Sequence, residues 1–388
     1  MNDKLNFNWN DLLSILRRAF SLKKMLSLSF FGVIALLIYN GFSWGAAWLV
    51  RDSFQDSASI MHYWWNSYGL LPDFTGIYFP WYGTMVYTLG VALSWIVMAM
   101  GMTAAARVTF QEFRGDYFFS SWDAIRFALK NWKRIVLSPL LILVLLAMIT
   151  VAGIIEALIF KIPYLGELFN SLMLILILPF TLIWLFIAIV FVVALRYTPS
   201  VTASIEEDFF EVVYQIFSSV SAQPARLVGY AVVTTVQAVV GFFIWSVALY
   251  QGFQIFYRIF GHVDSGKTYL LITNAYYLIL EAFPALRWFS HDPVLAQLQY
   301  IATPQSQSWL GCSWSMAISS WILAIFIGMI MMAAVSYFLS VIAVGDTIAY
   351  LIIRYKKDED DLIALSAGEE TELESELEPV DNPDNAVT

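Results

Sequence analysis

Residues that could do chemistry are scarce in the apolar part of this sequence. Carboxylates stand inside long apolar stretches at Glu156 and Asp346, and an amide stands inside another at Gln237. A charge near the centre of a bilayer costs about 2.5–3.5 kcal/mol on insertion scales, so such residues usually mark an ion pathway or pair with a partner. These three are the candidate intramembrane polar sites, and a proton or cation site at the outer mouth is the chemistry that Glu156 would support.

Glu156 and Gln237 also have purely structural interpretations. Glu156 follows Ile135 by roughly 30 Å of helix, which places it near the outer surface, where an interfacial carboxylate beside Lys161 is the simpler expectation. Gln237 has Thr234 and Thr235 next to it and is expected to make an interhelical hydrogen bond near mid-membrane.

Asp346 has two alternatives. A helix break at Gly345 would make Asp346 the cap of a surface helix, and this is the expected arrangement. Without a break, Asp346 lies roughly 12 Å deep and needs a partner such as Arg107 or Arg196.

Other chemistry finds little support in the residue types. Cys312 is the only cysteine, which excludes an intrachain disulfide, a CxxC motif and a multi-cysteine cluster. His62, His262 and His291 lie in separate loops without ligand spacing, so a metal site would have to be assembled from all three. No catalytic set of clustered residues is present. We therefore expect no enzyme activity, no cofactor, no metal and no nucleic-acid partner.

The elements that hold these residues are membrane helices. The chain has 60% apolar and 13% charged residues, against about 45–50% and about 25% in soluble domains, which excludes a soluble enzyme. The sequence predicts an all-α, polytopic helical bundle whose partner is the lipid bilayer. Spans are predicted near 26–50, 82–106, 135–160, 171–195, 227–257 and 315–343.

Basic residues predict the orientation. With the N-terminus inside, cytoplasmic segments hold sixteen of the 21 Lys and Arg, and outer segments hold the other five. Because cytoplasmic loops retain positive charge, both termini are expected in the cytoplasm of a bacterial inner membrane. The apolar segment 269–286 contains Asn274, Glu281 and Pro284, which favours an interfacial or re-entrant helix over a seventh span.

A pattern of amphipathic helix, outward span and inward span occurs three times. The amphipathic helices are expected at about 8–22, 119–133 and 205–222, with capping-box spacing at Ser120 and Asp123 and at Ser204 and Glu207. The inward spans end at Arg107, Arg196 and Arg354, which would anchor at the headgroups. Any two-span hairpin could look similar, and that alternative stays open.

Three segments resemble a diffuse group of bacterial six-span proteins. They are DAIRFALKNWKRIVL (123–137), FFEVVYQIFSSVSAQPARLVGY (209–230) and DTIAYLIIRYKKDEDDL (346–362). The group includes the membrane domain of some glycerophosphodiester phosphodiesterases and stand-alone relatives. The resemblance implies a compact helical bundle with cytoplasmic interfacial helices. It brings no hydrolase activity, because the phosphodiesterase domain is missing from this sequence.

Three further features bear on partners. Aromatic residues crowd the outer loops 51–81 and 258–314 and predict a small cap, or else a docking surface for a lipid or an outer partner. Gly41 and Gly45, like Ala324 and Gly328, have the small-xxx-small spacing of close helix contacts, within one chain or in a homo-oligomer. Residues 358–388 form an acidic tail after the 1–357 bundle, either a disordered extension or a contact for a cytoplasmic protein.

These features predict a non-enzymatic integral membrane protein that organises or partners envelope components. The alternative is a transporter or channel for a lipid or small molecule. A transporter would need a continuous polar path through Gln237 and through buried Glu156 or Asp346, whereas an organising protein would have a closed bundle.

Overall fold

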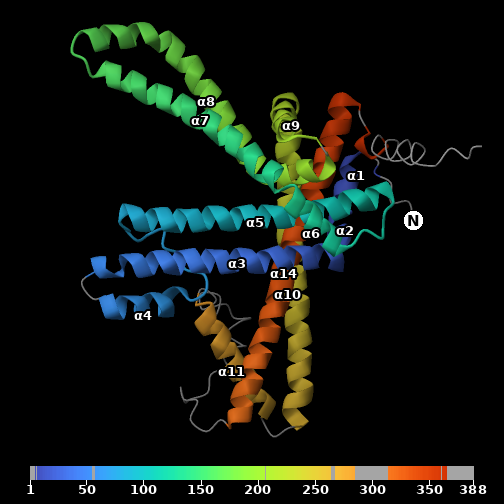
Figure 1. Ribbon diagram of the computed structural model, residues 1–388. Helices are drawn as coiled ribbons and strands as arrows, with labels where there is room; N and C mark the ends of the chain where they lie inside the picture. The colour runs from blue at the N-terminus through green and yellow to red at the C-terminus, as the bar shows by residue number, and fades with distance from the viewer. Residues whose placement is uncertain are drawn as a thin grey trace, which may run out of the picture. The chain divides into compact units, whose positions relative to one another are not determined.

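The computed structural model describes residues 5, 7–54, 57–205, 207–263, 267–284, 313–359 and 361–364 (Figure 1). Every regular element in these ranges is a helix, which confirms the all-α class. Cys312, His291 and the acidic tail beyond 364 lie outside the described residues, as does the side chain of His262.

Six helices are long and apolar enough to cross a membrane, which confirms the predicted number of spans. Several run past the predicted apolar windows, because their ends continue as polar or buried helix. The largest difference is the sixth, predicted to span 315–343 and observed to run to Asp358. The long helices are α3 (Leu22–Val50), α5 (Trp81–Arg114), α7 (Trp132–Phe160), α8 (Leu165–Ser204), α10 (Pro224–Val263) and α14 (Trp314–Asp358).

Shorter helices precede or connect the long ones. They are α1 (Trp9–Leu12), α2 (Ile15–Ala19), the 3-10 turn η1 (Arg51–Ser53), α4 (Ser57–Tyr68), α6 (Ser121–Lys130), α9 (Phe209–Ala222) and α11 (Lys267–Ala282). A short helix followed by two long ones therefore occurs three times, as α2–α3–α5, α6–α7–α8 and α9–α10–α14, with α4 and α11 as insertions. This element order agrees with the predicted repeat.

The chain divides into two compact units. The first contains 1–28, 99–238 and 339–388, and the second contains 29–98 and 239–338. Each division falls inside a long helix, so α3, α5, α10 and α14 contribute one part to each unit. All three candidate polar residues belong to the first unit.

In each repeat the second long helix is α5, α8 or α14. The core of the first unit lies at the C-terminal ends of these three helices. Residues 103–111 of α5, 197–204 of α8 and 343–353 of α14 are each buried without interruption. A helix on the surface of a bundle buries only one stripe, so these ends are surrounded on all sides. The predicted anchor Arg107 is accordingly only 6% exposed, and it lies in protein instead of reaching headgroups.

The three amphipathic helices differ from one another. Ser120 caps α6 by accepting a hydrogen bond from the backbone of Asp123, at 3.2 Å, as the capping-box spacing predicts. The second capping box is wrong: Ser204 ends α8 and bonds back to the carbonyl of Ser200, and Asp208 is the residue that precedes α9. The segment predicted as one helix at 8–22 is broken into α1 and α2.

In the second unit, the segment between α3 and α5 folds into a small aromatic cap. Trp64 and Phe74 are each 2% exposed and pack with Ala47 and Val50 of α3. At the end of α4, Gly69 has φ +58°, and a Cβ there would lie 2.4 Å from the carbonyl oxygen of Ala282 in α11. This part of the predicted cap is therefore packed and also contacts α11, while residues 285–312 of the second aromatic loop lie outside the described residues.

A small turn stabilises the cap next to Phe74. The backbone N–H and the hydroxyl of Thr75 donate to Asp73 Oδ1, at 3.1 and 2.6 Å. These hydrogen bonds hold the pKa of Asp73 below its usual range.

The predicted small-residue positions are not the close helix contacts within this chain, and their use in a homo-oligomer stays a prediction. A Cβ added at Gly41, Gly45 or Gly328 would meet nothing within 4 Å. Close approach occurs at other glycines instead: a Cβ at Gly90 would lie 2.3 Å from Phe42, and one at Gly345 would lie 2.3 Å from Thr234. A small-xxx-small spacing shows which face is small, but it does not show what packs there.

Candidate functional site

Asp346 lies in the interior of an unbroken helix. The expected break at Gly345 is wrong, because α14 continues through this residue to Asp358. Gly345 serves packing, since it lets α10 approach α14 so closely that a Cβ would collide with the Thr234 side chain. Asp346 is thus carried into the core with 1% of its surface exposed.

Arg196 of α8 neutralises this buried carboxylate. Its Nε donates to Asp346 Oδ2 at 2.9 Å and its Nη2 donates to Oδ1 at 2.9 Å. Two parallel hydrogen bonds between guanidinium and carboxylate form the strongest common type of ion pair. Arg196 is one of the two partners that the sequence proposed for a buried Asp346.

The remaining donors of Arg196 reach α10. Its Nη1 donates to the hydroxyl of Thr235 at 3.0 Å, and its Nη2 also reaches the carbonyl oxygen of Ala231 at 3.3 Å. The guanidinium therefore connects α8, α10 and α14. Because its side chain remains 29% exposed, Arg196 is less completely buried than its partner.

A second polar contact joins α8 and α14 one residue further along. The hydroxyl of Thr347 donates to the carbonyl of Ala343 at 2.7 Å and lies 3.3 Å from the hydroxyl of Ser200. Both oxygens of Asp346 are thus occupied by Arg196, whereas the buried hydroxyl of Thr234 has no hydrogen-bond partner among the described residues. An incoming cation would have to displace Arg196 to reach the carboxylate.

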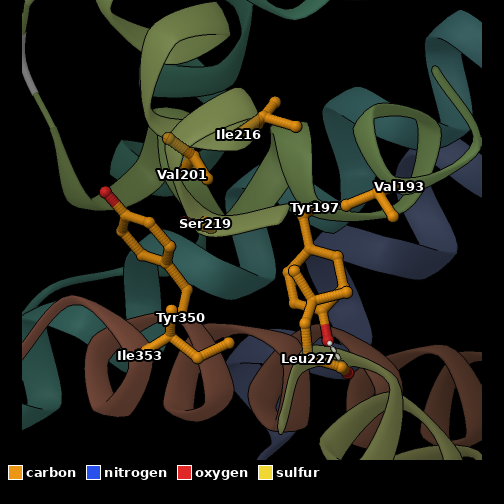
Figure 2. Close-up of a pocket in the computed structure, with 8 residues that line it drawn as sticks. All are labelled: Val193, Tyr197, Val201, Ile216, Ser219, Leu227, Tyr350 and Ile353. Atoms are coloured by element: carbon orange, nitrogen blue, oxygen red, sulfur yellow. Dashed lines mark hydrogen bonds between the residues drawn. The ribbon is translucent and has the colours of Figure 1, made fainter. Parts of the chain in front are cut away.

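A small cavity adjoins this group of residues (Figure 2). Its volume is about 10 Å³, which is roughly enough for one water molecule. The hydroxyl of Tyr197 donates to the carbonyl of Leu227 at 3.5 Å, whereas the buried hydroxyl of Tyr350 has no hydrogen-bond partner among the described residues. The lining residues are Val193, Tyr197, Val201, Ile216, Ser219, Leu227, Tyr350 and Ile353.

Gln237 makes its hydrogen bond to the N-terminal segment. Its Nε2 donates to the carbonyl oxygen of Leu12 at 3.0 Å, while its Oε1 has no partner in the described structure. Leu12 is the last residue of α1, where a helix leaves carbonyls unsatisfied. The predicted interhelical bond is therefore present, but its acceptor belongs to a helix that was expected on the membrane surface.

Glu156 stands apart from the other two candidates. It lies one turn before the end of α7 and is partly exposed. The structure shows no ion pair between Glu156 and Lys161, and the Oε1 atom of Glu156 has no hydrogen-bond partner among the described residues. Within the described residues, no group of three His, Cys, Asp or Glu is arranged to share a metal ion.

A second buried ion pair was not anticipated from the sequence. The Nζ of Lys24 lies 2.6 Å from Glu112 Oε2, with the lysine side chain 0% exposed and the glutamate side chain 24% exposed. Lys24 also donates to the carbonyl of Arg18 at 2.9 Å. Both residues stand beside span ends, where charges ordinarily face water. No local signal distinguishes a buried charge there, because burial depends on a long-range contact.

No known protein supplies a function for these contacts by similarity. A scan against models of protein families, a search of curated proteins and a search of solved structures each found no match.

Proposed function

We propose that this chain is a non-enzymatic protein of the bacterial cytoplasmic membrane that organises or partners other envelope components. The supporting observation is that two of the three candidate polar residues, Asp346 and Gln237, are hydrogen-bonded to other helices of the first unit. Asp346 is held by Arg196, and the amide nitrogen of Gln237 is held by Leu12. A protein whose core serves to hold its helices together has this pattern.

The resemblance to glycerophosphodiester phosphodiesterase membrane domains is part of the same proposal. Its three segments, 123–137, 209–230 and 346–362, all fall in the first unit. They include most of α6 and α9 and the C-terminal end of α14. The resemblance would thus reflect a packing core that this chain shares with those membrane domains.

Transport of a lipid or small molecule is the second candidate function. The observation that favours it is the carboxylate of Asp346 within a membrane helix, since such residues are rare outside ion pathways. Against it stand the small size of the nearby cavity and the hydrogen bonds by which Arg196 occupies both oxygens of Asp346.

Thiol accessibility distinguishes the two functions. After Cys312→Ser, single cysteines are introduced in separate proteins at Ser200, Thr235 and Thr347, which surround the ion pair. Phe118→Cys is the positive control, because Phe118 is 95% exposed. A closed bundle predicts that a membrane-impermeant maleimide, supplied to both sides of the membrane, labels only the control. Labelling of any of the three core positions would favour transport.

Partnering is tested by removing the acidic tail at a suitable position. At the end of α14, Asp358 Oδ2 forms ion pairs with Arg354 Nε at 3.0 Å and with Lys357 Nζ at 3.1 Å. A deletion that begins at 358 would therefore also damage the helix. We therefore expect deletion of 365–388 to leave the fold intact and to abolish recovery of specific partners after cross-linking in cells. Equal recovery of the same partners without the tail would exclude this role for it.

A further inference from the structure

One of the three amphipathic helices carries an exposed face that the fold does not use. On α6, Ala124, Ile125 and Ala128 are buried in the first unit. A neighbouring face presents Trp122 and Leu129, which are 54% and 49% exposed. These apolar side chains are too exposed to contribute much to the core.

Cationic side chains are interleaved with these apolar ones. The Arg126 side chain is 68% exposed and lies over the ring of Trp122, 5.5 Å from its centroid. Lys130 follows one turn later, and Lys133 follows in the first turn of α7; both are exposed and form no ion pair within the described residues. Asp123 is the one acidic residue here, 4.0 Å from Arg126. The face therefore has a net positive charge.

The position of this face along the chain sets its depth. The third membrane span begins at Trp132, directly after α6 and the single residue Asn131. Trp132 is 46% exposed. Side chains within one turn of the start of a span lie at the level of the lipid headgroups, where Trp anchors and Lys extends its amine toward phosphate.

The other two amphipathic segments differ from α6 in their cations, although the first also exposes Leu13, Phe20 and Leu22. In the first, Leu12 and Ile15 are buried, Lys24 pairs with Glu112, and Arg18 lies over the ring of Phe113. In the third, residues 205–222 contain no Lys or Arg. In α6 and the first turn of α7, the exposed cations Arg126, Lys130 and Lys133 lie close to exposed Trp and Leu side chains.

We infer that the exposed face formed by Trp122, Arg126, Leu129, Lys130, Trp132 and Lys133 binds the headgroups of anionic phospholipids. The apolar side chains would enter the upper acyl region, and the three cations would meet phosphate. Attraction of a basic amphipathic helix to anionic lipid has this combination of features. The inference requires only that α7 spans the membrane, and it is independent of the proposed organising function.

Lipid selectivity of the full-length protein tests the inference. The protein is reconstituted in phosphatidylcholine bilayers, and electron paramagnetic resonance measures the association of spin-labelled phosphatidylglycerol relative to spin-labelled phosphatidylcholine. We expect a preference of about fivefold for phosphatidylglycerol at low salt, the effect of about one surface cation. This preference should weaken as salt screens the charges.

Three variants locate the preference. R126Q/K130Q/K133Q should reduce the selectivity to about one, whereas R126K/K130R/K133R should keep it. R17Q/R226Q/K356Q removes the same charge from other exposed positions and should also keep it. The inference is overturned if the wild type shows no preference, if its preference does not respond to salt, or if the two charge-removing variants lose selectivity equally. The salt response of the wild type remains decisive if a variant fails to fold.

Discussion

At the scale of single residues, the Arg196–Asp346 pair predicts an asymmetry between single and double substitutions. Asp346 is 1% exposed and accepts hydrogen bonds from two nitrogens of Arg196. Asp346→Leu leaves a guanidinium in the core without its counter-charge, and Arg196→Met leaves the carboxylate alone. Each should cost about 3–5 kcal/mol of unfolding free energy, whereas the double substitution should be nearly neutral.

Unfolding in mixed detergent micelles measures this difference. The matched control is Arg126→Met, which removes an exposed arginine with an Asp123 contact of 4.0 Å and should change stability by less than about 1 kcal/mol. If the double variant is as unstable as the sum of the two single ones, the pair has a role beyond mutual neutralisation.

Gly345 supplies a second prediction at this scale. Gly345→Ala places a methyl group 2.3 Å from Thr234 Cγ2 and should destabilise by about 1–3 kcal/mol. Gly328→Ala, in the same helix, meets nothing within 4 Å and should be neutral or stabilising by up to about 1 kcal/mol.

Restoration of space tests the explanation for Gly345. Adding Thr234→Ala removes the atoms that the new methyl group would strike, so it should recover most of the loss in the same detergent measurement. A loss that persists in the double variant would show that Gly345 is required for a reason other than its contact with α10.

The residues of the site were largely predictable, but their surroundings were not. An aspartate and an arginine in apolar helices predict each other, because neither is tolerated alone in the membrane. The expectation of a break at Gly345 failed because glycine near a helix end has two meanings, termination and close packing. Only the position of Thr234 on another helix distinguishes them.

At the scale of elements, the N-terminal segment depends on contacts from elsewhere in the chain. Helices α1 and α2 have four and five residues, far fewer than the roughly 12–15 that an isolated helix needs. Their carbonyls instead accept hydrogen bonds from Gln237 to Leu12 and from Ser340 to Ala19, at 3.0 and 2.8 Å.

We expect the amides of 12–19 to be protected from hydrogen exchange despite the shortness of these helices. Gln237→Ala should raise their exchange rates, because the hydrogen bond to Leu12 is lost. Gln254→Ala is the matched control on the same helix, since Gln254 bonds to Tyr250 within α10. Fast exchange of 12–19 in the wild type would mean that this segment is not held in the core.

The pattern of apolar residues predicted which face of a short helix is buried, but it did not predict what that face packs against. In the first, Leu12, Ile15 and Ala19 of the apolar stripe are buried, and Leu16 of the same stripe is partly buried. The same pattern fits a helix on a membrane surface or one against protein, because both environments are apolar. Burial against a helix more than 200 residues away in sequence leaves no mark in the local spacing.

At the scale of the whole molecule, the number of spans sets a parity. The six helices that are long and apolar enough to cross a membrane would, as its spans, place the two ends of the chain on the same side, as the sequence predicts. The parity does not depend on how the two units are arranged. Helix α11 is not counted among the spans, because it has only 16 residues.

The distribution of basic residues then decides which side that is. Phe118, between α5 and α6, and Tyr78, before α5, are 95% and 99% exposed and stand on either side of a single span. In a Cys312→Ser background, we expect Tyr78→Cys to react with an impermeant maleimide in sealed, right-side-out spheroplasts and Phe118→Cys to react only after permeabilisation. The reason is that the segment around Phe118 contains Arg114, Arg126 and Lys130, and positively charged loops stay in the cytoplasm. Reversed labelling would invert the orientation while keeping the parity, and labelling of both in sealed spheroplasts would show that α5 does not cross.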